Sequence, residues 1–244
     1  MRSLLSGLVV LVWLAGCAPS LDAPDQTGLL GGFAVPVRPL EERWIIAVPN
    51  FEIRAGSVEV TGLDAATQDE AFFKELGSGV ADIFVSEAFR SGQFRITERA
   101  ELDKVLFEQD LAQSGRIDPE TAADVGKITG AELIVLGSLT EFGISVTGGG
   151  GRVLNIVGGS AESVSARVTV DIRLVDAVTA EVVAIGIGTS QVSQGNVEVD
   201  VLNIIRALQA GRSGTTIIDI AVRNAIRDAI NEAATSLPQK QVTG

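Results

Sequence analysis

The chain has 244 residues, of which 46% are apolar, 20% charged and 5% aromatic, with one cysteine and neither histidine nor tyrosine. Its formal net charge of −12 repels nucleic-acid backbones, so we expect no nucleic-acid partner. Without histidine and with one cysteine there is no imidazole base, histidine metal cluster, cysteine–histidine nucleophile or intrachain disulfide. We therefore expect a protein that is not an enzyme and that uses no metal or other cofactor.

The first residues are typical of a secretory leader. A positive start precedes an apolar run over residues 4–14, which ends in Leu14-Ala15-Gly16-Cys17. The run is shorter than the roughly 20 apolar residues of a membrane-spanning helix, so it predicts a signal peptide over residues 1–16. The tetrapeptide resembles the bacterial lipobox, which implies a diacylglycerol and an N-acyl chain such as palmitate on Cys17. An ordinary signal peptide that contains a cysteine is the alternative.

The stretch after the cysteine predicts where the protein is held. Ala18 carries no retention charge, which in the lipoprotein pattern implies sorting to the outer membrane. Two or three acyl chains, at roughly 0.8 kcal/mol per buried methylene, make a stable anchor. Residues 17–40 contain four prolines and several glycines, and we expect them to form an extended tether.

Strand and helix patterns alternate through residues 41–244. Short apolar runs predict strands over residues 44–48, 94–97 and 133–136. Apolar residues at helical spacing, with capping residues, predict helices over residues 72–89, 102–111, 118–130 and 217–236. This alternation favours an α/β domain with a mixed sheet.

Several short motifs then follow one another in order. They are the segment 98–109, Ser114-Gly115, Gly126-Lys127, the run 130–135 and Gly137-Ser138. The series resembles the CsgG/HfaB family of outer-membrane lipoproteins, which includes the curli secretion channel and the holdfast-anchoring channel. The resemblance covers about residues 44–236. LpoB-like activators of peptidoglycan synthases are similar through the same core, so the motifs leave open whether the chain forms a pore.

A strict period of two begins after this core. From Val164 to Leu174 every even position is apolar and every odd position is polar. Phe142, Ile144, Val146, Leu154 and Ile156 keep the same parity, and Arg152 departs from it. With a turn at Gly158-Gly159-Ser160, this predicts a long β-hairpin over about 142–174. Each arm exceeds the 9 to 11 residues that cross a bilayer as a tilted strand, and the alternation is typical of a transmembrane β-barrel. The resemblance implies a second hairpin over about 182–216.

Four arms are too few to close a barrel, because even small barrels need about eight strands. We therefore expect a homo-oligomeric ring whose hairpins together form the membrane barrel, with polar odd-numbered side chains lining the channel. These candidate lining residues are Asn155, Ser163, Ser165, Arg167, Thr169, Asp171 and Arg173. The alternative is a sheet with one face on helices and the other in water.

A second candidate site is the loop before the first long helix. In the channel family this loop carries an aromatic residue that narrows the pore. The position that matches it by spacing is Phe73, with Phe72 beside it. The family pattern also has a Tyr upstream and an Asn next to the Phe, and this chain has neither. The alternative is that both are core residues of the helix.

Taken together, the resemblance implies an outer-membrane lipoprotein with its α/β domain in the periplasm. Its copies would form a pore that secretes curli-like fibre subunits or anchors holdfast-type adhesins, together with accessory secretion proteins. The alternative is a periplasmic lipoprotein without a pore that activates or scaffolds a cell-wall synthase.

Overall fold

The computed structural model describes residues 30–54, 56–60, 68–99, 101–114, 116, 118, 128–147, 159–199, 205–207, 209–210 and 217–240. Within these residues the helices are η1 (Leu40–Glu42), α1 (Glu70–Ser91), α2 (Leu102–Gln113) and α4 (Ile217–Ser236). The strands are β1 (Trp44–Ala47), β2 (Glu52–Ile53), β3 (Val58–Val60), β4 (Phe94–Thr97), β5 (Leu133–Thr147), β6 (Gly159–Asp176) and β7 (Val182–Val199). These elements confirm the expected α/β layout. The expected helix over 118–130 lies almost wholly outside the described residues.

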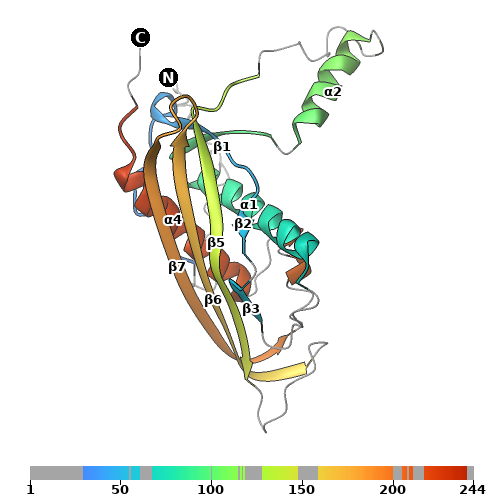
Figure 1. The fold of residues 1–244 in the computed structure, drawn as a ribbon, viewed down its shortest axis with the longest axis vertical. Helices are drawn as coiled ribbons and strands as arrows, with labels where there is room; N and C mark the ends of the chain where they lie inside the picture. The colour runs from blue at the N-terminus through green and yellow to red at the C-terminus, as the bar shows by residue number, and fades with distance from the viewer. Residues whose placement is uncertain are drawn as a thin grey trace, which may run out of the picture.

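The described strands form one open, mixed sheet in the order β4-β1-β5-β6-β7, with β2 and β3 paired to β5 further along that strand. β1, β2 and β3 run parallel to β5, whereas β6 runs antiparallel to both of its neighbours, β5 and β7. Figure 1 shows the three long strands side by side along the length of the molecule. The short strands β1, β2 and β3 therefore line the outer edge of β5 from Leu133 to Ile144. We call the three long strands β5, β6 and β7 the tongue.

Two features of the long strands differ from the sequence expectation. Gly159 and Ser160 already pair with Val199 and Glu198 of β7, so the turn expected at Gly158-Gly159-Ser160 is wrong. β5 ends at Thr147, and residues 148–158 lie outside the described residues. Residues 205–207 are helical, so the second hairpin expected over about 182–216 does not continue as strand there, and Ile205 is buried in the core.

A bulge in β5 exchanges the faces of that strand. Before the bulge the buried residues are odd-numbered, as in Leu133 and Leu139, and after it they are even-numbered, as in Phe142 and Ile144. The pairing with β6 shifts register between Leu139 and Glu141, which inserts one extra residue. For this reason a single strand carries what the sequence shows as two separate strand patterns.

Helices α1 and α4 cover one face of the sheet (Figure 1). The Asp69 side chain caps α1 by accepting a hydrogen bond of 2.8 Å from the Phe72 N–H, and Gly92 ends the helix with a φ of 65°. Among the described residues, no helix has both the length and the apolar character that a membrane span requires.

The contact between α4 and β7 is made by small residues. A Cβ atom on Gly188 would lie 1.8 Å from the Ala225 carbonyl oxygen, and one on Gly186 would lie 2.0 Å from the Ala229 carbonyl oxygen. Only glycine fits at these two positions. Because α4 lies so close, the even-numbered residues of β6 from Val164 to Leu174 are at most 1% exposed.

A buried ionic network joins α1 to α4. The Glu87 carboxylate, fully buried in α1, accepts hydrogen bonds from Arg223 and, at 2.7 Å, from Arg227 of α4. Arg223 also donates to Asp219 at 3.0 Å. Burial alone would lower the pKa of Arg223, but Asp219 and Glu87 outweigh it and raise that pKa, so the guanidinium stays charged. Since an unpaired charge here would be costly, the network fixes how the two helices sit against each other.

The described part of the expected tether is docked on α4. The Gly31 N–H donates to the Asn224 side chain at 2.8 Å, and the Ala34 N–H donates to the Asn231 side chain at 2.9 Å. The Arg227 guanidinium lies 5.3 Å from the centre of the Phe33 ring. From residue 30 onward the chain is therefore part of the folded domain and not a free linker.

The close contact at Gly188 predicts a large effect of a single methyl group. We expect Gly188→Ala to lower the free energy of unfolding by about 1–3 kcal/mol, because the added carbon overlaps the α4 backbone. Gly130→Ala is the matched control, because a Cβ there meets nothing within 4 Å. Urea unfolding followed by circular dichroism measures both. Equal midpoints for the two variants would contradict the close approach of α4 to β7.

Candidate functional site

The face of β5, β6 and β7 that α1 and α4 leave uncovered carries most of the candidate lining residues. On β6, Ser163, Ser165, Thr169 and Asp171 are partly exposed, and Arg167 and Arg173 are exposed. The structure therefore brings these six residues together along one face. Asn155 and Cys17 lie outside the described residues. We call this surface the open face.

Neighbouring strands extend the polar row that β6 begins. The Ser193 hydroxyl of β7 donates to the Ser165 hydroxyl at 2.9 Å. Thr169 lies 3.1 Å from the Thr189 hydroxyl on one side and donates to the Glu141 carboxylate at 3.1 Å on the other. These cross-strand bonds join three strands into one polar surface.

The polar residues of β7 were not among the predicted lining residues, for a physical reason. An alternating strand is recognised by apolar side chains on its inner face, and two inner positions of β7 are Gly186 and Gly188. Between Ala184 and Val192 the inner row therefore gives little apolar contrast to the outward row of Thr189, Gln191 and Ser193. The polar residues at every second position were the signal available in the sequence.

Two shallow hollows lie on the open face. The first, of about 320 Å³, surrounds Arg167, which donates to the Gln191 side chain at 2.8 Å and lies 3.8 Å from the Glu141 carboxylate. Its remaining walls come from the neighbouring strands and include Glu59, Gly143, Ile144, Ser145 and Ser165.

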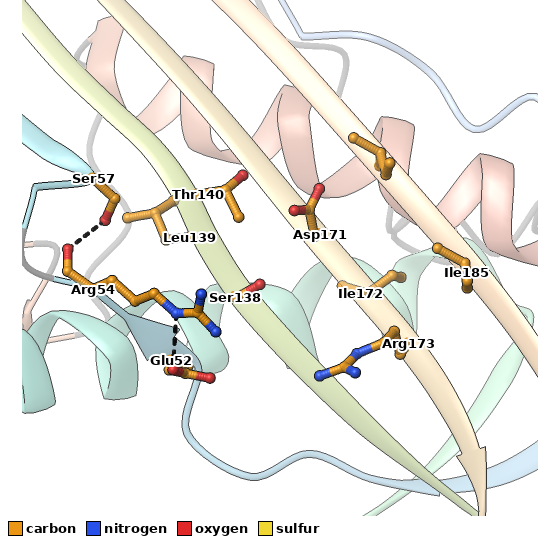
Figure 2. A pocket seen from close by; sticks show the side chains of 11 residues that line it. Glu52, Arg54, Ser57, Ser138, Leu139, Thr140, Asp171, Ile172, Arg173 and Ile185 are labelled. Carbon is orange, nitrogen blue, oxygen red and sulfur yellow. Dashed lines mark hydrogen bonds and ion pairs between the residues drawn. The ribbon is translucent and has the colours of Figure 1, made fainter. Parts of the chain in front are cut away.

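The second hollow, of about 530 Å³, lies where β2 meets β5 and is drawn in Figure 2. On one side Arg54 forms an ion pair of 3.2 Å with Glu52, and on the other side Asp171 and Arg173 project from β6. Ile185 of β7 adds an apolar wall. Acidic and basic groups are thus balanced in this hollow.

The open face is suited to weak, reversible contact. Its described side chains offer hydroxyl, amide and paired charged groups, which exchange readily with water. No group of three or more potential metal ligands occurs among the described residues. Where β1 and β2 pair with β5, the open face becomes more apolar, because Leu136, Ile185 and Ile187 are about half exposed there.

Phe72 and Phe73 lie in the first turn of α1. Their rings are 5.4 Å apart in an edge-to-face arrangement, and both pack against the core while partly exposed. Because α1 covers the opposite face of the sheet, one chain does not bring them together with the open face. The loop at residues 61–67 that precedes them is outside the described residues.

The family model described as curli production assembly/transport component CsgG matches residues 35–244 of this chain. The match confirms the family resemblance seen in the sequence motifs. No curated protein sequence matches the chain.

Several solved structures are similar in fold, at low scores. Lipoprotein GNA1162 from Neisseria meningitidis is 14% identical, covers 67% of this chain and 93% of its own, and has a TM-score of 0.32. Protein XCC0632 from Xanthomonas campestris is 11% identical, with coverages of 84% and 93% and a TM-score of 0.36. The PelC dodecamer from Paraburkholderia phytofirmans is 11% identical, with coverages of 82% and 91% and a TM-score of 0.26. At these scores the similarities carry no argument about function.

The two faces of β6 predict a sharp contrast in thiol reactivity. Arg167 points to the open face, whereas the adjacent Val168 is fully buried under the helices. A cysteine in Arg167→Cys should react with a polar maleimide about tenfold faster, or more, than one in Val168→Cys, because the buried position reacts only when the sheet opens locally. Labelling is measured by mass spectrometry against the unsubstituted chain. Equal rates would show that α4 does not stay on the sheet.

Proposed function

Because the chain belongs to the CsgG family, we propose that it is an outer-membrane lipoprotein whose copies form a ring that conducts the polypeptide subunits of a surface fibre or adhesin. Acyl chains on Cys17 would hold it at the membrane, with the α/β domain in the periplasm. The observation that carries this proposal is the open face, a continuous polar surface along three unusually long strands.

The strand lengths support a membrane role. β5 has 15 residues, and β6 and β7 have 18 each, whereas strands in globular proteins usually have about 5 or 6. A tilted strand crosses the bilayer with about 9 to 11 residues. The long strands can thus serve both as part of the α/β domain and as part of a membrane span.

The cover provided by α4 limits which residues can face lipid. The apolar face of β6 from Val164 to Leu174 is packed on protein, so it has no free surface for lipid. We therefore place the membrane span toward the tip of the tongue, beyond this cover. Thr169, Asp171 and Arg173 would then line a vestibule inside the periplasmic ring, with Ser163 and Ser165 nearer the membrane.

The open sheet also explains why a ring is needed. In a bilayer every backbone N–H and C=O group must be paired, so free strand edges are excluded there. One chain offers such edges, and several copies that pair their tongues remove them. A lining of hydroxyls and balanced charges suits an unfolded polypeptide, because it makes no strong contact with any one segment. Phe72 and Phe73 would narrow this path in a ring that brings the first turn of α1 to its axis.

One observation favours a second candidate function. The even-numbered residues of β6 pack on α4 as in an ordinary domain that has one face of its sheet in water. That arrangement also fits a periplasmic lipoprotein without a pore, which would activate or scaffold a cell-wall synthase through its α/β domain. Ion conductance of the purified protein in planar bilayers distinguishes the pore from the lipoprotein without a pore.

The anchor predicts the behaviour of Cys17→Ala. Without the thiol that accepts diacylglycerol, the precursor should stay unprocessed and the protein should be lost from the outer-membrane fraction. Mass spectrometry of the mature N-terminus and membrane fractionation measure these two effects. Ala18→Ser, which leaves the acylated position intact, is the control. Unchanged processing of Cys17→Ala would exclude the lipoprotein proposal.

The vestibule predicts a charge effect on ion selectivity. In planar bilayers the purified protein should conduct, and Thr169→Lys should shift the reversal potential in a salt gradient toward anions, because each copy adds a positive charge within about one Debye length of the path. Thr235→Lys is the matched control, since Thr235 is exposed on α4, away from the open face. Equal shifts in both variants would show that the open face does not line the path of the ions. Absence of conductance would favour the second candidate function, a lipoprotein without a pore.

A further inference from the structure

Helix α2 stands apart from the rest of the described domain. None of its residues is buried, and in Figure 1 it projects away from the sheet at the upper right. Val105, Leu106 and Phe107 are all exposed, Phe107 to 66%. An isolated helix of 12 residues is marginal in water, and exposed apolar residues in a group mark an interaction surface. The helix therefore needs a partner, and the described part of its own chain does not supply one.

The charge of α2 narrows the choice of partner. The helix and its N-cap carry the acids Glu101, Asp103, Glu108 and Asp110 against one base, Lys104. Lys104 is already paired with Glu101. A surface that covers the apolar residues of α2 should therefore combine apolar side chains with unpaired positive charge.

The opposite flank of the same chain has such a surface. Val37, Leu40 and Phe89 are each exposed to 61–63%. The Arg38 backbone N–H donates to the Gly92 carbonyl at 3.2 Å, which holds this part of the chain beside the end of α1, where Phe89 lies in the last turn. We call these three residues the flank patch.

The charges around the flank patch complement α2. Arg90 and Arg95 are exposed, and residues 88–95 contain no acid. Arg90 is paired with Glu87 at 3.3 Å, whereas the Arg95 side chain makes no hydrogen bond or ion pair with the described part of the chain. Arg95 lies on β4, an edge of the sheet. Residues 37–43 are neutral, with two arginines and two glutamates. The flank is therefore locally basic in a chain whose net charge is −12.

The two surfaces lie on opposite sides of one chain. Figure 1 places η1, next to the flank patch, at the upper left and α2 at the upper right, at the same end of the molecule. Two different surfaces that complement each other across a molecule give head-to-tail contacts, which close into a ring when the rotation between copies allows it.

We propose that α2 of one copy packs on the flank patch of the next copy, with the acids of α2 facing Arg95. The partner of α2 is thus a second copy of this chain. This inference rests on the proposed ring and gives it an interface at the end of the domain away from the strand tips. Phe107 and Leu106 would supply the apolar centre, and the charges would set the direction of assembly.

Disulfide trapping tests the contact in the full-length protein. In the double variant Phe107→Cys with Phe89→Cys, oxidation should give a ladder of linked copies, because each chain supplies one thiol to each neighbour. Phe107→Cys with Asp228→Cys is the matched control, since Asp228 is exposed on α4, outside the flank patch. We expect about tenfold more ladder than in the control, because a contact raises the effective thiol concentration to the millimolar range. A linked monomer would mean that α2 folds onto its own chain. Either that result or a ladder equal to the control overturns the proposal.

Reversing one charge on α2 and one on the flank tests this contact independently of the pore. Asp103→Lys should reduce the oligomer on a sizing column, and adding Arg95→Glu should restore it, which a simple folding defect would not allow. Circular dichroism checks that each variant is folded. Wild-type conductance without an enriched ladder would overturn the α2 contact and leave the pore standing. An enriched ladder without conductance would support the α2 contact and reject the pore.

Discussion

The close approach of α4 to β6 and β7 determines the rest of this structure. Gly186 and Gly188 let the helix backbone touch the strand, and the alanines of α4 at 225 and 229 keep its facing side small. With the helix this close, every even-numbered residue of β6 from Val164 to Leu174 is buried. Once the apolar face is taken by protein, the odd-numbered polar residues are left as the free surface. The same contact therefore creates the core and selects the face that can meet a ligand or a channel.

This constraint also decides how far a membrane pore can extend into the domain. A strand whose apolar face is packed on a helix cannot offer that face to lipid without losing the packing, which is worth about 25 cal/mol for each Å² of apolar surface kept from water. The ionic network of Glu87, Arg223 and Asp219 adds a further cost to moving α4, because separation from α1 would leave buried charges unpaired. The helix α4 is thus held by β7 and by α1. The proposed membrane span would begin where α4 no longer covers the strands.

The sequence predicts the elements whose signals are local. The spacing of apolar residues in α1 and α4, the short strands β1 and β4, and the alternation in β6 all depend on near neighbours along the chain, and the structure has each of them. The misses come from long-range contacts. The bulge after Leu139 is fixed by pairing with β6, and residues 30–38 are fixed by Asn224 and Asn231, nearly 200 residues away. On β7 two inner positions are glycines where α4 touches the strand, and no local pattern in the sequence records that contact.

The proposed ring combines two kinds of contact that differ in what they can fix. Strand edges pair through backbone groups, and such pairing alone permits slips of register wherever neither face is strongly specified. A contact of side chains, such as α2 on the flank patch, specifies a single relative position, because the ring of Phe107 and the charges around it fit one place. With copies held by such a contact at one end, the tongues meet at the other end in a defined register and at high local concentration, which lowers the entropic cost of closing the sheet.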